Sequence, residues 1–229
     1  MDSLIFDCDG VLVDSEAIAE ATLIDLLAAW LPDLATEEEL TAALGMTTAN
    51  ILGHLEARSA HRLPADATAR VDATIEARLA NELDAIDGVA EAIKAVESLV
   101  LPLAVVSNSR RRRVVASLAN TGLDAQLGKA PLFTAEQVAH PKPAPDVYRL
   151  AASHLGVAPA ACLVIEDSVS GTRAACAAGM TVIGFTGASH VEPGHAQRLR
   201  DAGAWQVLTH MAALGELVQR WRGERHAVR

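Results

Sequence analysis

The sequence predicts an α/β protein in which a parallel sheet is covered by helices on both faces and an all-helical segment is inserted after the first strand. Three observations predict this fold. Leu4-Ile5-Phe6 is a short apolar run at the start of the chain. Residues 15 to about 83 show helical patterns and no strand, and from Asp87 onward apolar runs alternate with helices. Uniformly apolar strands alternating with helices are typical of a parallel sheet buried on both faces.

The helical segment divides into successive helices. Apolar residues recur at helical spacing from Glu16 to Trp30, and Pro32 ends this helix. Thr36 followed by Glu39 has the pattern of a capping box and predicts the start of the next helix. A loop is predicted at 44–47, a helix at 49–57, and a last helix from Pro64 to about Leu83.

In the remainder of the chain, predicted strands alternate with predicted helices. Strands are predicted at 101–107, 131–133, 162–168, 181–185 and 205–209. Helices are predicted at 88–99, 110–120, 142–155 (with proline in its first turn), 168–178, 194–202 and 210–222. The pattern gives a core of residues 1–13 and 84–229, and an inserted domain of residues 14–83.

Polar groups follow several of the predicted strands at the point where each strand ends. These groups are Asp7 and Asp9, Ser107 and Asn108, Glu166 and Asp167, together with Lys142 ahead of a helix. In an open parallel sheet, ligands bind beyond the carboxyl ends of the strands. The topology therefore predicts that side chains scattered over most of the chain converge on one edge of the sheet.

The chemistry of these groups is complementary. Carboxylates are the hard oxygen ligands that Mg²⁺ prefers, and two acids so close together need a cation or a proton to offset their charge. The serine hydroxyl, the asparagine amide and the lysine ammonium are donors suited to a phosphoryl group. An aspartate can attack phosphorus, and a second acid can transfer the proton.

Four short motifs carry a family resemblance. They are DCDG (7–10), SN (107–108), the lysine of KPAPDVY (142–148) and ED in VIEDS (164–168). With these four motifs in this order, the chain resembles members of the haloacid dehalogenase-like hydrolase superfamily, in the subfamily that has a helical cap after the first strand. FDCDGVLVDSE and ELDAIDG (82–88) are similar to bacterial 6-phosphogluconate phosphatases. The resemblance implies a Rossmann-like three-layer core, an all-helical cap and Mg²⁺ as cofactor.

The resemblance also implies roles for the motif residues. Asp7 would be the nucleophile and a metal ligand, and Asp9 the general acid and base, binding the metal through its main-chain carbonyl. Ser107 and the backbone at Asn108 would bind the transferred phosphoryl group. Lys142 would neutralise the nucleophile and the phosphate, and Asp167 with Glu166 would complete the metal site.

Each motif also has an ordinary structural interpretation. The acids could be solvated loop residues or helix caps, Ser107 and Asn108 turn residues, and Lys142 a surface lysine. Because the chain has only three lysines, a lysine directly before Pro143 is notable. The Arg110–Arg113 run is interpreted as a solvated helix face, with attraction of an anionic substrate by Arg110 or Arg111 as the alternative.

The expected function is a Mg²⁺-dependent phosphatase of a small phosphorylated metabolite, a sugar phosphate or a sugar-acid phosphate such as 6-phosphogluconate. The alternatives are a β-phosphoglucomutase-like phosphomutase and a non-catalytic phosphometabolite-binding module. The resemblance disfavours the mutase. Members of that branch carry a histidine in the cap and basic residues in a cap loop, and in this chain Ala19, Leu44 and Thr48 occupy those positions. The intact motif set disfavours the binding module.

Composition narrows the partners. The net charge of −10 in 229 residues disfavours nucleic acid. No apolar run reaches the length needed to span a bilayer, and no signal segment begins the chain. We therefore expect a cytoplasmic protein without membrane or nucleic-acid partners, with a monomer expected and a homodimer left open.

Overall fold

The computed structural model describes residues 1–34, 48–189 and 191–227 of the chain. The described residues form two compact units, Met1–Ser15 with Leu83–Arg229, and Glu16–Glu82. The predicted boundaries of the inserted domain lie within two residues of this division. The predicted capping box at Thr36 and Glu39 and the loop at 44–47 lie outside the described residues.

The larger unit is built on a six-stranded, fully parallel sheet in the order β3-β2-β1-β4-β5-β6. The strands are β1 (Ser3–Asp7), β2 (Leu103–Ser107), β3 (Leu132–Thr134), β4 (Cys162–Glu166), β5 (Thr181–Phe185) and β6 (Gln206–Leu208). The predicted α/β fold class is confirmed. The two central strands β1 and β4 are buried along their whole length, including the acids with which they end, as expected of strands at the centre of a parallel sheet.

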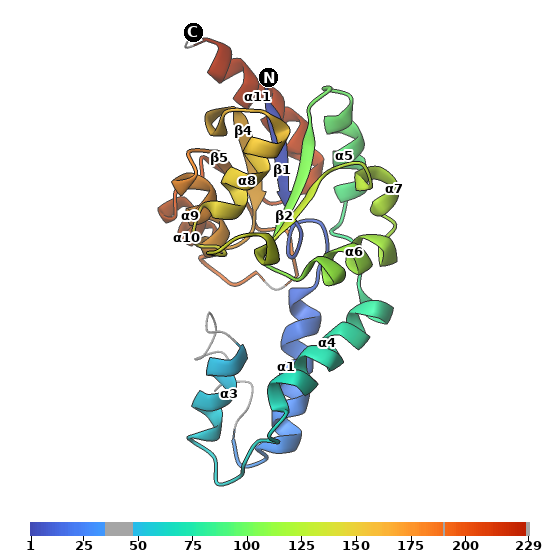
Figure 1. Cartoon of the computed structure of the whole chain (residues 1–229), viewed down its shortest axis with the longest axis vertical. Coiled ribbons are helices and arrows are strands. Elements are labelled where there is room, and N and C mark those ends of the chain that lie inside the picture. Colours follow the sequence, from blue (N-terminus) through green and yellow to red (C-terminus); the bar gives the residue numbers. More distant parts are fainter. Residues whose placement is uncertain (35–47, 190, 228–229) are drawn as a thin grey trace. The chain divides into compact units, whose positions relative to one another are not determined.

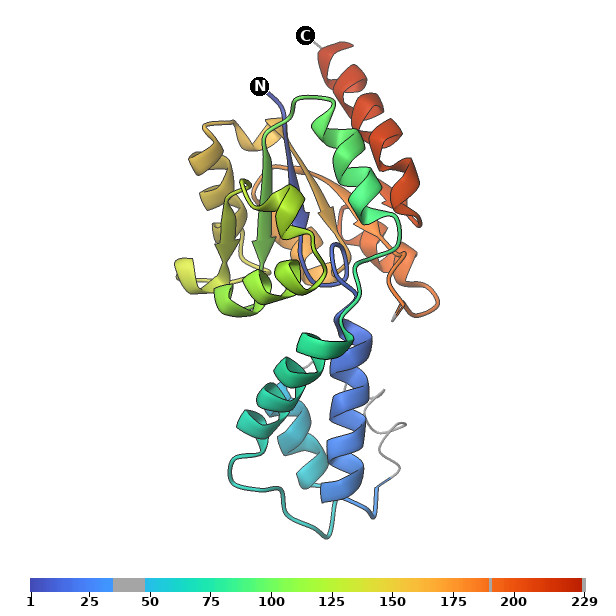
Figure 2. The same ribbon diagram turned by 90° about the vertical axis from the view of Figure 1, so that its right-hand side faces the viewer.

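Helices cover both faces of the sheet, as Figures 1 and 2 show for α5 and α11 on one face and α8 on the other. The helices of this unit are α5 (Val89–Glu97), α6 (Arg111–Asn120), α7 (Asp124–Leu127), α8 (Asp146–Leu155), α9 (Val169–Ala177), α10 (His195–Asp201) and α11 (Leu214–Ala227). Three-residue 3₁₀ turns occur at Ala135–Gln137, Pro159–Ala161 and Met211–Ala213. On the α8 side, alternate strand residues such as Ile5 and Val164 pack against Val147 and Ala151.

The structure corrects three details of the predicted elements. The short helix α7 was not predicted, because four residues carry too little periodicity. α8 begins at Asp146, so the prolines at 143 and 145 lie in the turn before the helix and not in its first turn. The last helix runs from Leu214 to Ala227 after a 3₁₀ turn, later than predicted.

The smaller unit contains α1 (Glu16–Trp30), α3 (Thr48–Glu56) and α4 (Ala67–Glu82). Buried leucines and β-branched residues at helical spacing, such as Leu27 on α1 and Val71 and Ile75 on α4, form its core. Arg78 links the two long helices, because its guanidinium contacts Asp25 on α1 and Glu82 on α4. Among the described residues of both units, no helix is long and apolar enough to cross a membrane.

Candidate active site

Strand register places the predicted site at the carboxyl ends of the central strands. Asp7 pairs with Val106 of β2, while Phe6 pairs with Ile165 of β4. The register therefore brings Asp7 level with Glu166, the last residue of β4. Residues that follow these strands must emerge at the same edge of the sheet.

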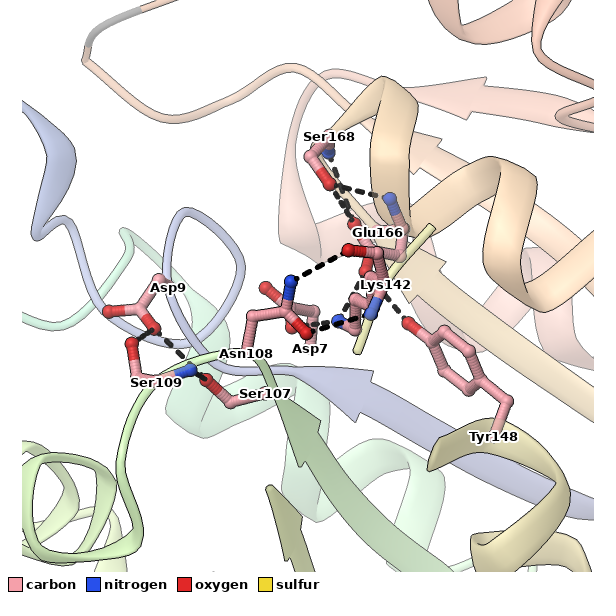
Figure 3. A network of polar contacts seen from close by, with 10 residues as sticks. Asp7, Asp9, Ser107, Asn108, Ser109, Lys142, Tyr148, Glu166 and Ser168 are labelled. Carbon is pink, nitrogen blue, oxygen red and sulfur yellow. Dashed lines mark hydrogen bonds and ion pairs between the residues drawn. The ribbon is translucent and has the colours of Figure 1, made fainter. Parts of the chain in front are cut away.

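The first group of side chains centres on Lys142, a buried lysine (Figure 3). Its ammonium Nζ lies 2.5 Å from Asp7 Oδ1 and 2.6 Å from Glu166 Oε1. A surface lysine cannot explain these contacts, because the Lys142 side chain is 4% exposed. The ammonium instead offsets the charge of two carboxylates that would otherwise repel each other.

Asp7, Glu166 and Asp167 form a buried acidic cluster. One carboxylate oxygen from each lies within 4.8 Å of the others. Three carboxylates and the single Lys142 ammonium leave two formal negative charges uncompensated by these four groups. A buried set of hard oxygen ligands with this charge fits a divalent cation such as Mg²⁺.

Electrostatics in the cluster depend on its cations. Burial raises the pKa of Asp7 well above its usual range, and the carboxylates of Glu166 and Asp167 act in the same direction, while the Lys142 ammonium opposes them. Burial alone would lower the pKa of Lys142, but Asp7 and Glu166 outweigh it and raise that pKa. A divalent cation would act with Lys142 to favour the ionised form of Asp7.

Asp9 belongs to a second group, which lies apart from the Lys142 contacts (Figure 3). Its Oδ2 accepts hydrogen bonds from Ser107 Oγ at 3.2 Å and Ser109 Oγ at 2.7 Å. Its Oδ1 accepts from Ser15 Oγ at 2.8 Å and lies 3.3 Å from Arg113 Nη2. Burial alone would raise the pKa of Asp9, but the Arg113 guanidinium and these hydroxyl donors lower it.

Asn108 connects the two groups through the backbone. Its side-chain amide donates to the main-chain oxygen of Lys142 at 3.2 Å, and its Oδ1 accepts from the Lys142 N–H at 3.1 Å. These reciprocal bonds fix the loop that carries Lys142 to the end of β2. The side chain of Asn108 is thus a scaffold for Lys142, which leaves the backbone at this position for a ligand.

Glycines make room for two of the acids. A Cβ atom at Gly10, where φ is +73°, would lie 2.0 Å from Asp167 Oδ2. A Cβ at Gly171, in the first turn of α9, would lie 1.7 Å from Glu166 Oε1. Gly171 was not predicted to have a role in the site. The signal for Gly171 was a glycine inside a predicted helix, where glycine needs a reason.

The Arg110–Arg113 run is not uniformly a solvated face. Arg110, Arg111 and Arg112 are exposed, but Arg113 is half-buried and contacts Asp9. Arg111 donates to the main-chain oxygen of Leu132 at 3.0 Å. Helical spacing turns the fourth arginine of the run toward the strand ends, which sequence reasoning did not anticipate.

Tyr148 is a further polar contact that sequence reasoning missed. Its hydroxyl donates to Glu166 Oε1 at 2.7 Å, and its ring lies 5.0 Å from the Lys142 ammonium. Ser168 donates to the other oxygen, Glu166 Oε2, through both its N–H and its hydroxyl. Glu166 is thus held at both oxygens.

We expect Tyr148→Phe to lower the free energy of unfolding by about 1.5–3 kcal/mol, the usual worth of a hydrogen bond to a charged group. The ring would still pack in the core, so the loss reports the hydroxyl alone. Urea denaturation of the two proteins measures it. An unchanged unfolding midpoint with an unchanged m-value would contradict the assigned contact.

Comparisons with known proteins agree with this fold. Residues 4–185 match the family model described as haloacid dehalogenase-like hydrolase. The chain belongs to this family, and the predicted family membership is confirmed.

Two relatives are identical to the chain at about a third of the aligned positions. Protein CbbY of Rhodobacter capsulatus is 33% identical, over 79% of this chain and 83% of the relative. Hexitol phosphatase B of Escherichia coli is 31% identical, over 78% of this chain and 81% of the relative. A crystal structure of a HAD family hydrolase from Deinococcus radiodurans, with bound phosphate and sodium, is 33% identical with a TM-score of 0.82, covering 96% of both chains.

The predicted likeness to 6-phosphogluconate phosphatases is present but not specific. The Escherichia coli enzyme of that name is 28% identical, over 84% of this chain and 86% of the relative. CbbY and hexitol phosphatase B match at slightly higher identity. The prediction of a phosphatase of this hydrolase family is confirmed.

Proposed function

We propose that this protein is a Mg²⁺-dependent phosphatase that hydrolyses a small sugar phosphate or sugar-acid phosphate through an aspartyl-phosphate on Asp7. The observation that carries the proposal is the buried cluster of Asp7, Glu166 and Asp167 with Lys142 at 2.5 Å from Asp7. The relatives named for the hydrolysis of hexitol phosphates and 6-phosphogluconate support the substrate class.

Mg²⁺, held by the carboxylates of Asp7, Glu166 and Asp167, would offset the repulsion between a carboxylate nucleophile and an anionic phosphate. Metal binding by the main-chain carbonyl of Asp9 remains part of the proposal.

In the proposed reaction, a carboxylate oxygen of Asp7 attacks phosphorus and the bond to the leaving oxygen breaks. Asp9 donates a proton to that oxygen and later takes one from the water that attacks the phosphorus of the aspartyl-phosphate; the bond between phosphorus and the Asp7 oxygen then breaks, which releases phosphate and restores the carboxylate. Lys142, with Ser107 and the backbone at Asn108, would hold the phosphoryl oxygens. The hydroxyl and guanidinium donors around Asp9 favour its ionised form, which is the form that takes a proton from water in the second step.

The selection of substrate by the helical unit remains a proposal. In this family arrangement, closure of such a unit would exclude water during phosphoryl transfer. We extend the proposal to the loop near Gly45–Thr48, which would contribute to specificity; of this loop the structure describes Thr48 alone.

A substrate panel tests the proposed function directly. Purified protein with Mg²⁺ is assayed for phosphate release from hexitol phosphates, hexose 1- and 6-phosphates, pentulose bisphosphates and 6-phosphogluconate. Turnover of at least one member is the expected result. Interconversion of hexose 1-phosphate and 6-phosphate without phosphate release would favour the phosphomutase, and binding without turnover would favour the non-catalytic module.

Removal of the metal has a clear expected result. Treatment with EDTA should abolish phosphate release, because the metal would no longer offset the repulsion between the carboxylate nucleophile and the anionic phosphate. Addition of excess Mg²⁺ should restore the activity, whereas NaCl at matched ionic strength should not. Full activity in EDTA after dialysis would contradict the metal dependence.

A further inference from the structure

His195 links the acidic cluster to the loop and helix that follow β5. Its Nε2 lies 2.5 Å from the main-chain oxygen of Asp167. A carbonyl oxygen can only accept a hydrogen bond, so Nε2 must carry the hydrogen. The sequence offered no sign of this contact, because His195 stands 28 residues from Asp167 in a polar stretch.

Arg198 fixes the same tautomer from the other side of the ring. Its Nη2 lies 3.1 Å from His195 Nδ1, and a guanidinium can only donate, so Nδ1 must accept. The same Nη2 donates to Glu192 Oε2 at 3.0 Å. A chain of polar contacts therefore runs from exposed Glu192 through Arg198 and His195 to buried Asp167.

Asp167 is thereby restrained at two points. Its carboxylate occupies the space beside Gly10, where a Cβ would lie 2.0 Å from Oδ2. Its main-chain oxygen is held by the imidazole of His195. A shift of the peptide at Asp167 would move the carboxylate out of the cluster that it forms with Asp7 and Glu166.

We propose that His195 is a positioning residue, which holds the backbone at Asp167 so that the acidic cluster is preformed for a divalent cation. Arg198 supports this role by keeping the hydrogen of His195 on Nε2. The inference rests on the proposed metal dependence and extends it to residues outside the four family motifs. Residues that orient a metal ligand typically contribute 10–100-fold to metal affinity.

The test measures Mg²⁺ binding to the full-length protein by isothermal titration calorimetry, together with kcat at saturating Mg²⁺. We expect His195→Ala to weaken Mg²⁺ binding by about 10–100-fold while kcat at saturating Mg²⁺ changes by less than about threefold. His195→Gln should stay close to the wild type, because its amide nitrogen reaches the position of Nε2. His195→Asn should behave as His195→Ala, because its amide nitrogen reaches only the position of Nδ1.

A matched pair on the same helix tests the role of Arg198. Arg198→Ala should weaken Mg²⁺ binding severalfold, whereas Arg200→Ala, which removes the same charge from α10, should leave it unchanged. If His195→Ala does not fold, the comparison of His195→Gln with His195→Asn decides.

Three results would overturn the inference: Mg²⁺ affinity unchanged in His195→Ala, equal losses in His195→Gln and His195→Asn, or a wild type that binds no Mg²⁺. Failure of the proposed phosphatase activity is distinguishable, because the calorimetry uses Mg²⁺ alone. A protein that binds Mg²⁺ through this cluster and releases no phosphate would refute the function and leave the role of His195 intact.

Discussion

Asp7→Asn is expected to lower kcat for phosphate release by at least about 10³-fold, because the amide cannot form the aspartyl-phosphate. The substitution conserves the shape of the side chain, and its Oδ1 can still accept the hydrogen bond from Lys142 that the carboxylate accepts at 2.5 Å. The fold should therefore survive. The loss should appear in kcat, with a smaller effect on substrate binding.

Steady-state kinetics and the thermal unfolding midpoint, measured on the same preparation, separate chemistry from folding. Asp72→Asn is the matched control, because Asp72 is exposed on α4 of the helical unit. That variant should retain wild-type kinetics. Activity of Asp7→Asn within tenfold of the wild type would remove Asp7 from the role of nucleophile.

Gly171→Ala is expected to damage both stability and activity, although it adds a single methyl group. The new Cβ would lie 1.7 Å from Glu166 Oε1, the oxygen that accepts from Lys142 and Tyr148. The carboxylate must move, and the Lys142 ammonium then loses one of its two acidic partners. Overpacking of this kind costs about 1–3 kcal/mol. A displacement of about 1 Å in a catalytic group can lower the rate by about 10²-fold.

Gly223→Ala supplies the matched control for this substitution. Gly223 lies inside α11 of the same unit, and a Cβ there meets nothing within 4 Å. Alanine should raise the free energy of unfolding at that site by about 0.5–1 kcal/mol, because glycine is the poorer helix former. In urea denaturation the free energy of unfolding should fall for Gly171→Ala and rise for Gly223→Ala, and kcat/KM should fall only for Gly171→Ala. If Gly171→Ala were as stable and as active as Gly223→Ala, the packing of Glu166 would be misassigned.

The sequence was sufficient to predict the sheet and the edge at which the site lies. Several apolar strands end in acids or in Ser107-Asn108. Once the strands are parallel, these polar residues must lie at one edge of the sheet. The family motifs then added the expected roles. These predictions depend on local pattern and on topology, both of which are readable from one chain.

The contacts that complete the site were not readable. Tyr148 occupies a core position of α8, and its hydroxyl meets Glu166 only because α8 packs against β2, β3 and α9 on this face of the sheet. Arg113 and His195 reach Asp9 and the backbone of Asp167 across distances of about a hundred and about thirty residues. Such pairs depend on how the helices pack, and the type of a single residue does not indicate its distant partner.

The fold also gives Asp7 and Asp9 different surroundings. Sequence reasoning grouped Asp7 and Asp9 as one pair of acids at a strand end. In the structure Asp7 faces Lys142 and the acidic cluster, whereas Asp9 faces three serine hydroxyls and Arg113. Their environments push the two pKa values apart, burial raising that of Asp7 and the donors around Asp9 lowering that of Asp9. In the proposed reaction, a divalent cation at the acidic cluster would act with Lys142 against the upward shift of Asp7, so that Asp7 is ionised when it attacks.

Trapping of the covalent intermediate tests the central claim most directly. The substrate of the panel with the fastest turnover is mixed with enzyme and Mg²⁺, quenched in acid within milliseconds and reduced with borohydride, which converts an aspartyl-phosphate to homoserine. Peptide mass spectrometry then locates the modified residue. We predict homoserine at position 7, dependent on substrate and absent from Asp7→Asn. Rapid phosphate release with no modification at position 7, or modification of another residue, would contradict the account.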